Sequence, residues 1–251
     1  MERTRDMGTS LVFTSGKGGT GKSTAVSAIA SCLATLGKRT LCIDMDLRLP
    51  NLDLLLGMSD LTTLDLADVA SGQHSLEEAA VEHPDIPGLF LLTGPAVYNG
   101  QITGEDLAKI VETAKEQFDY CLIDGPAGLD EVFFLTAKTA DEAIVVATTD
   151  ATSQRDAQRA VMELDEMGIR DIRMILNRVR IKLLVRSAIN VDDMIDFVGV
   201  PLLGLVPEDP DVVASASRLR PLVLYSRRWA ASAFLRITKR ILGEDIPLSH
   251  K

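Results

Sequence analysis

The sequence predicts an α/β protein with a doubly wound, mostly parallel sheet and helices on both faces. Near-continuous apolar runs, which are typical of buried parallel strands, alternate along the chain with stretches of helical spacing. The expected strands are 11–13, 39–44, 89–93, 120–124, 143–147, 172–176 and 202–206. The expected helices are 25–36, 62–70, 104–117, 153–167, 191–198 and 226–242. A fold of this class places its ligand sites at the carboxyl ends of the strands.

The chain length fits one domain. With 251 residues, 46% hydrophobic and 25% charged, it can bury one substantial core, and it contains no internal repeat or low-complexity linker. We therefore expect a single domain over 1–251. Residues 1–9 are polar and expected to be flexible, and 244–251 form a short tail.

Charge and cysteine content restrict the partners and the compartment. A net charge of −10 argues against DNA binding by the whole surface. Cys32, Cys42 and Cys121 stand in apolar contexts without metal-ligand spacing, as expected of buried thiols in a reducing cytoplasm. The sequence has neither a membrane-spanning apolar run nor a signal-peptide core. We predict a cytoplasmic protein whose association with a membrane, if any, is peripheral.

A glycine-rich loop between the first strand and the first helix carries the strongest chemical signal. Gly16–Ser23 fits the phosphate-loop pattern G-x-x-x-x-G-K-[ST] in its required context. Glycine lets the backbone turn its N–H groups toward a phosphate, and the helix directs its positive end at the anion. Lys22 is predicted to reach the β- and γ-phosphates of ATP, and the Ser23 hydroxyl to bind Mg²⁺. The predicted nucleotide-binding residues here are Gly16, Lys17, Gly18, Gly19, Thr20, Gly21, Lys22, Ser23 and Thr24.

A second lysine, Lys17, lies inside this loop and is not required by an ordinary phosphate loop. Two neighbouring cations repel each other unless phosphate charge offsets both. The run Lys-Gly-Gly-Thr-Gly-Lys-Ser resembles the deviant Walker A box of the MinD/ParA family of ATPases. The resemblance implies that Lys17 reaches the partner's nucleotide in an ATP-dependent homodimer. It makes Lys17, Lys22 and Asp46 the catalytic residues.

The second predicted strand ends in two aspartates, Asp44 and Asp46. Carboxylates at this strand end can reach the γ-phosphate, its Mg²⁺ and the attacking water, although an acidic turn would look the same. The following segment, with Asn51 and Asp53, resembles switch I of the MinD branch of the family. That resemblance implies that Asp46 orients water and contacts the metal and that Asp44 supports the site. Whether Asp46 takes a proton or only positions water stays open.

A third carboxylate, Asp124, ends the buried strand 120–124. This is the Walker B arrangement, in which the carboxylate holds Mg²⁺ through water opposite the Ser23 hydroxyl. Apolar strands that end in Asp are common in α/β proteins, and the position after the phosphate loop strengthens the functional interpretation. The loop that follows contains Gly125, Pro126 and Gly128 and by resemblance is switch II.

Two further strand ends are candidates for base and partner contacts. An Asn177 amide could pair with the adenine edge, and by resemblance Arg178 and the segment Pro207, Glu208 and Asp209 complete that site. A polar strand end is the plainer interpretation. After 143–147, Thr152 or Ser153 is expected to cap a helix, while Arg155 and Asp156 are candidates for a dimer or partner surface.

Basic residues concentrate in two stretches of this acidic chain. Residues 218–242 carry seven basic residues and no acidic one, and the second stretch contains Arg178, Arg180, Lys182 and Arg186. A lipid surface or, less favoured, DNA could bind there, but a closing helix with a solvated basic face is the plainer interpretation of the pattern. The separate C-terminal targeting helix of membrane-associated relatives is absent from this sequence, in which Pro247 discourages helix continuation.

The resemblance covers roughly 11–246 and implies a function. We expect an ATPase that binds Mg·ATP, dimerises, recruits a partner protein and hydrolyses ATP slowly under partner stimulation, in spatial positioning of the division site. The alternatives are a DNA-partitioning or flagellar-placement ATPase, a related metabolic ligase, and a nucleotide-loaded scaffold without turnover. The family pattern Asn-x-Gly-x-Pro is replaced here by Ser217–Pro221, so local backbone shape is expected to differ.

Overall fold

One mixed sheet forms the centre of the molecule. The computed structural model describes residues 7–47, 50–95, 97–98, 100–180 and 190–248. Within these residues eight strands pair in the order β3-β4-β2-β5-β1-β6-β7-β8, and only β3 and β4 are antiparallel. The strands are β1 Thr9–Ser15, β2 Thr40–Asp44, β3 Val81–Glu82, β4 Leu89–Leu92, β5 Tyr120–Ala127, β6 Glu142–Ala147, β7 Asp171–Val179 and β8 Leu202–Pro207. The predicted doubly wound fold is confirmed.

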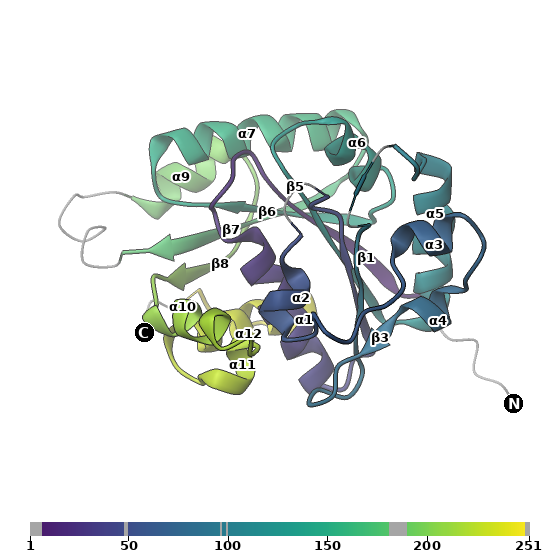
Figure 1. Cartoon of the computed structure of the whole chain (residues 1–251). Coiled ribbons are helices and arrows are strands. Elements are labelled where there is room, and N and C mark those ends of the chain that lie inside the picture. Colours follow the sequence, from purple (N-terminus) through teal and green to yellow (C-terminus); the bar gives the residue numbers. More distant parts are fainter. Residues whose placement is uncertain (1–6, 48–49, 96, 99, 181–189, 249–251) are drawn as a thin grey trace, which may run out of the picture.

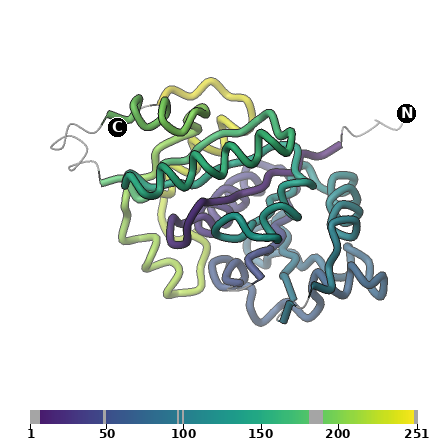
Figure 2. The backbone as a smooth tube through the Cα atoms, turned by 90° about the horizontal axis from the view of Figure 1, so that it is seen from above, coloured from purple at the N-terminus to yellow at the C-terminus, as the bar shows by residue number. Residues whose placement is uncertain are grey.

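Helices cover both faces of this sheet (Figure 1, and from above Figure 2). One layer holds α1 Lys22–Thr35, α2 Leu52–Leu56, α10 Pro210–Ser217, α11 Leu222–Tyr225 and α12 Trp229–Ile241. The other holds α3 Leu66–Ala70, α4 Leu76–Ala79, α5 Gly104–Gln117, α6 Glu131–Ala137, α7 Ala151–Glu166 and α9 Val191–Val198.

Each face has its own apolar core, which explains the apolar runs of the sequence. In β1, Leu11 and Phe13 point into the core under α1 and α12, whereas Val12 points into the core under α5 and α7. Successive strand residues face opposite sides, so a strand covered on both faces must be apolar at every position. Because β1 and β2 each pair in parallel with β5, the carboxyl ends of these three strands meet at one edge of the sheet, beside the glycine loop.

Several boundaries differ from the prediction, each for a local reason. The segment 62–65 is not helical, because the Asp65 side chain caps α3 in a capping box with Asp68. The predicted helix 226–242 begins only at Trp229, which has a positive φ of 42°, and the separate turn α11 precedes it. Strand β1 starts at Thr9, two residues before the predicted start, because the Gly8 and Thr9 amides are bound to the carbonyls of Lys115 and Asp119.

The chain leaves α12 along an ordered segment. Arg240 donates to the carbonyls of Leu203 in β8 and of Ile246 and Pro247 in the tail, at 2.7–2.8 Å. None of the helices in the described part of the chain is long and apolar enough to cross a membrane. Lys182 and Arg186 of the second basic stretch lie outside the described residues.

Candidate nucleotide site

The glycine loop joins β1 to α1 at the carboxyl edge of the sheet. Gly19 and Gly21 have φ values of 79° and 87°, which side chains with a Cβ rarely adopt. A Cβ on Gly16 would lie 2.3 Å from the backbone of Asp156 in α7, so the loop needs glycine there for close packing. A cavity of about 570 Å³ opens in front of the loop. Its walls include residues 18–24 together with Asp46, Asn51, Leu54, Leu55, Pro126, Asp130, Ala216 and Leu219.

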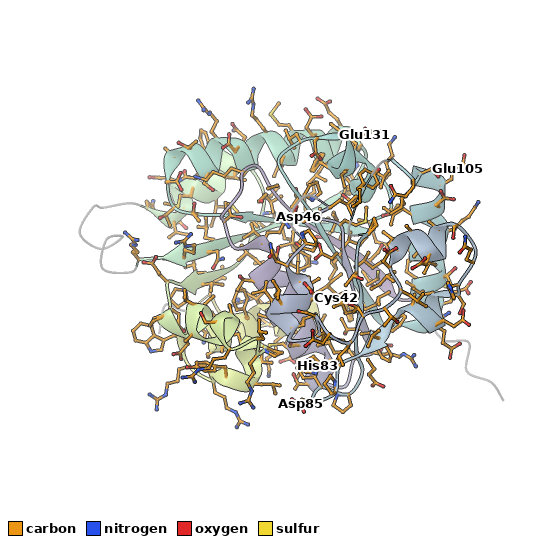
Figure 3. All side chains as sticks on the ribbon, in the orientation of Figure 1. Cys42, Asp46, His83, Asp85, Glu105 and Glu131 are labelled. Atoms are coloured by element: carbon orange, nitrogen blue, oxygen red, sulfur yellow. The ribbon has the colours of Figure 1, made fainter. Side chains whose placement is uncertain are left out.

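Lys22, which lines this cavity, forms a buried ion pair with Asp124. The Lys22 Nζ lies 2.5 Å from the Asp124 Oδ1, and the side chains are 5% and 1% exposed. Burial raises the pKa of Asp124, and the neighbouring ammonium works in the opposite direction. Asp46 lies 3.8 Å from the same ammonium and is labelled near the middle of Figure 3. The structure therefore brings together Lys22, Asp46 and Asp124, which come from three separate segments.

Two buried oxygens at this site have no partner among the described residues. The second carboxylate oxygen of Asp124, Oδ2, and the hydroxyl of Thr20 are both enclosed without a hydrogen bond. Buried polar atoms are normally satisfied, so such atoms indicate a missing ligand or water. Ser23 Oγ lies 3.4 Å from Lys22 Nζ on the same side. These groups fit a phosphate chain and a Mg²⁺ ion with its water shell.

Asp44 organises the segment that carries Asp46. Its carboxylate accepts hydrogen bonds from the backbone amides of Asp46, Asn51 and Leu52, at 3.0, 3.2 and 3.1 Å. Burial and the nearby Asp124 raise the pKa of Asp44 to about 7. Asp44 thus holds the Asp46 backbone and the start of α2 beside the cavity. Asp53 lies in the first turn of α2.

The predicted switch II loop is in part a continuation of β5. The strand runs through Gly125 and Pro126 to Ala127, and its register with β1 shifts between Phe13 and Ser15. A bulge of this kind accommodates proline inside a central strand. A Cβ at Gly125 would lie 2.8 Å from the Phe13 carbonyl. Gly128, with a φ of 100°, makes the turn toward α6.

Lys17 has a different environment from Lys22. Its Nζ lies 2.8 Å from Asp150 Oδ1, and the two side chains are 33% and 52% exposed. Asp150 also accepts the Ser153 amide and so caps α7. The expectation that Thr152 or Ser153 caps this helix is wrong, because α7 starts at Ala151 and the Ser153 hydroxyl instead accepts the Thr148 amide.

A second cavity, of about 290 Å³, adjoins the loop on the β7–β8 side. It is lined by Gly19, Gly21, Thr24, Asn177, Arg178, Pro207, Glu208, Asp209, Val212, Val213 and Phe234. All five residues predicted to contact the base therefore lie in one place. The Asn177 amide donates to the Thr20 carbonyl at 2.8 Å, and its oxygen accepts the Arg178 amide. Its contact with adenine stays a prediction, as this side chain already braces the loop.

The other residues of this cavity are also held internally. Arg178, with a φ of 54°, donates to the Gly19 carbonyl, and Glu208 pairs with Arg180 at 2.6 Å. Asp209 accepts the amides of Asp211 and Ala230, which caps α10 and ties it to α12. The base would then meet a preformed pocket rather than mobile side chains.

The structure adds site residues that the sequence interpretation did not assign. Asp150 is one of them, and its pairing with Lys17 joins residues far apart in the sequence. Leu54 and Leu219 form an apolar wall of the main cavity. No motif marks these two residues. Arg155 is exposed and Asp156 half-buried on α7, and neither lines the described cavities, so their contact with a partner stays a prediction.

Comparison with known proteins agrees with this geometry. A family model described as ParA, NUBPL iron-transfer P-loop NTPase, matches residues 6–242. The putative septum site-determining protein MinD of Emiliania huxleyi is 38% identical over 239 residues, which are 94% of this chain and 88% of that protein. The septum site-determining protein MinD of Synechocystis sp. is 37% identical over 242 residues, 94% and 90% of the two chains.

Among solved structures, this chain is likewise similar to MinD proteins. In the MinC:MinD cell division protein complex of Aquifex aeolicus, the matching chain is 35% identical, with a TM-score of 0.90 over 96% of this chain and 99% of that one. The septum site-determining protein MinD of Pyrococcus horikoshii, complexed with Mg-ADP, is 29% identical with a TM-score of 0.84, over 96% and 100% of the chains. The chain therefore belongs to the ParA family of P-loop NTPases and is a MinD-like ATPase whose cofactors are ATP and Mg²⁺.

Proposed function

We propose that this MinD-like ATPase positions the division site by cycling between an ATP-bound homodimer and an ADP-bound monomer. The observation that carries the proposal is the second loop lysine. Lys17 is half-buried at the mouth of the loop and held by one exposed carboxylate, so it can exchange Asp150 for a phosphate. Relatives with septum site-determining names support the division-site role.

The residues of the main cavity divide the work of hydrolysis. Ser23, Asp46 and Asp124 would hold Mg²⁺, which would neutralise phosphate charge when bound. The Lys22 ammonium lies beside both Asp46 and Asp124, so it offsets the repulsion between these carboxylates and the phosphate chain that it binds. Asp46 orients the attacking water, and Lys17 from the partner protomer stabilises charge on the transferred phosphoryl group. Turnover is slow until a partner protein completes this arrangement.

The partner of such a dimer is a protein bound in the ATP state. The Aquifex aeolicus relative was solved in a complex described as MinC:MinD, which supports partner binding by this fold. Arg155 and Asp156 lie in the first turns of α7, and the backbone of Asp156 lies against Gly16 of the loop. We assign these two residues to the partner surface, because a change in the loop on ATP binding would be transmitted to the start of α7.

The matching family model is described as an iron-transfer protein, but the cysteines of this chain are not suited to binding an iron–sulfur cluster. Iron–sulfur clusters are held by cysteine thiolates. Cys32, Cys42 and Cys121 are all buried, and burial raises the pKa of Cys32 to about 11 and that of Cys121 to about 12. Thiols in this state are poor metal ligands.

The test is the nucleotide dependence of the oligomeric state. We expect a monomer with Mg·ADP and a dimer with Mg·ATP by light scattering, with phosphate release measured in parallel. Asp46→Ala should trap the dimer without phosphate release, and Lys17→Ala should stay monomeric. A monomer in every nucleotide state would contradict the proposal. A wild-type dimer that retains ATP without releasing phosphate would instead indicate a scaffold.

Membrane association is a separate arm of the proposal, motivated by the basic residues of 218–242 in an acidic chain. Arg227, Arg228 and the exposed Trp229 stand together at the start of α12. Sedimentation with anionic vesicles should depend on Mg·ATP and weaken in Arg227→Glu/Arg228→Glu. DNA binding that appears only with ATP and falls steeply with salt would favour a partitioning ATPase instead.

A further inference from the structure

The short helix α2 forms part of the wall of the main cavity and is fixed at both ends. Leu54 and Leu55 line the cavity from its outer side, while Leu52 and Leu56 are buried in the core beneath it. At the start of the helix, the backbone amides of Asn51 and Leu52 donate hydrogen bonds to the Asp44 carboxylate. A helix of five residues has no stability of its own, so its position depends on such anchors.

The anchor at the far end of α2 is the ring of His83. The Leu56 carbonyl is among the last helix carbonyls, which have no partner inside the helix, and it lies 2.9 Å from His83 Nε2. His83 follows β3, comes from the edge hairpin of the sheet and is 4% exposed. Figure 3 labels it below Asp46, next to Asp85.

The other ring nitrogen fixes the state of the ring. Nδ1 lies 3.0 Å from the Asp85 amide and 3.1 Å from the Ile86 amide, and an amide can only donate. Nδ1 must therefore accept, which leaves the proton on Nε2 to be donated to Leu56. All three contacts are satisfied only by this neutral tautomer.

We propose that His83 is a positioning residue of the nucleotide site, tying α2 to the β3–β4 hairpin and so fixing the cavity wall. The hairpin is a firm support, because its turn is closed by the His83 amide on the Leu89 carbonyl and Ile86 is buried in the same core as Leu56. Asp44 and His83 thus hold the two ends of α2. The inference rests on the proposed ATP site and adds a residue outside its cavity.

Two amide substitutions separate the two functions of the ring. Asparagine can place an oxygen near Nδ1 and keep the turn, but it cannot reach Leu56. Glutamine can place an amide donor near Nε2 and keep the tie to α2. For His83→Asn we expect the dissociation constant for Mg·ATP to rise about five- to tenfold, as for one lost hydrogen bond, while His83→Gln stays within about twofold of wild type.

The measurement is titration calorimetry with a slowly hydrolysed ATP analogue, with circular dichroism to establish folding. His74→Asn is the matched control, since the side chain of this histidine is 39% exposed and does not line the cavity. Wild-type affinity in the folded His83→Asn protein, or equal losses in both His83 variants, would overturn the inference. Absence of binding by the wild type would instead overturn the proposed ATP site.

A measurement on the wild type keeps the proposal testable if His83→Asn does not fold. Ring ¹⁵N shifts should report a proton on Nε2. Because coupling between two sites is reciprocal, Mg·ATP should slow hydrogen exchange at the Asp85 and Ile86 amides as well as in α2. Slowing confined to α2 would show that the hairpin does not share in nucleotide binding and would overturn the proposal.

Discussion

The two lysines of the phosphate loop are both paired with aspartates, but in opposite environments. Lys22 and Asp124 are 5% and 1% exposed, and Lys22 lines the cavity. Lys17 and Asp150 are 33% and 52% exposed at the edge of the site. The distances are similar, at 2.5 and 2.8 Å, so solvent rather than geometry distinguishes the pairs.

This difference separates a fixed part of the site from a movable one. Removing one member of a buried ion pair costs about 3–5 kcal/mol, because the other charge is left without water or partner. An exposed pair contributes about 0–1 kcal/mol, since water replaces the lost partner. Lys22 is therefore built into the fold, whereas Lys17 can leave Asp150 at little cost.

The largest expected effect is that of Lys22→Met, which keeps the side-chain volume and removes the charge. We expect the free energy of unfolding at pH 7 to fall by about 3 kcal/mol, because Asp124 keeps its burial and loses its cation. The loss should shrink as the pH falls, since the pKa of Asp124 is already raised by burial and protonation removes its charge. Urea unfolding, monitored by circular dichroism at several pH values, measures the loss of stability and its pH dependence.

The double variant Lys22→Met/Asp124→Asn is the control for this prediction. It removes both charges and should recover most of the lost stability. A loss below about 1 kcal/mol in Lys22→Met would mean that the buried pair behaves like an exposed one, and the comparison would not hold.

An intermediate effect is expected for Lys17→Ala, and on activity rather than on stability. The free energy of unfolding should change by less than about 1 kcal/mol, while ATP turnover should fall to background because the proposed contact with the partner's phosphates is lost. Lys109→Ala, at an exposed position on α5, serves as the matched control. Normal turnover, or a stability loss equal to that of Lys22→Met, would argue against a movable Lys17.

The sequence could predict what lies within one segment. The glycines of 16–21, Lys22 and Ser23 form a contiguous motif. Asp44 ends β2 and Asp124 follows the apolar run of the neighbouring β5, so their meeting near one sheet edge followed from the fold class. The alternating pattern also predicted every described strand except the antiparallel edge strand β3, which is too short to leave a signal, whereas the helices α2, α4, α6 and α10 were not predicted.

Contacts between distant segments could not be predicted in this way. Asp150 caps α7 where Thr152 or Ser153 was expected, and only folding brings it to Lys17 across 133 positions. Asn177 was assigned to the base from its place at a strand end, yet its amide braces the Thr20 carbonyl. His83 stands in a short edge hairpin, where a single histidine carries no motif. Pairings of this kind depend on side-chain packing, which periodicity does not encode.

The smallest effect concerns the titration of Asp150. Burial tends to raise its pKa, but hydrogen bonds from Lys17, Thr148 and the Ser153 amide prevail and lower it to about 2. Since the pKa in the fold is below the usual value of 3.8, the pair stabilises the protein above pH 3.8, and this contribution is lost as the pH falls toward 2. The pair is exposed, so this loss should barely change overall stability.

Carboxyl ¹³C shifts of Asp150 between pH 5 and pH 3 test this directly. In the wild type they should hardly move, whereas in Lys17→Ala the titration should begin at higher pH, because one of the three donors is gone. Added salt should move the wild-type curve in the same direction, since exposed charges are screened. Asp106, which is bound to Thr103 in the cap of α5, is the internal control. Identical Asp150 curves in the two proteins would show that Lys17 is not held by this carboxylate in solution, and the movable lysine would then need no release step.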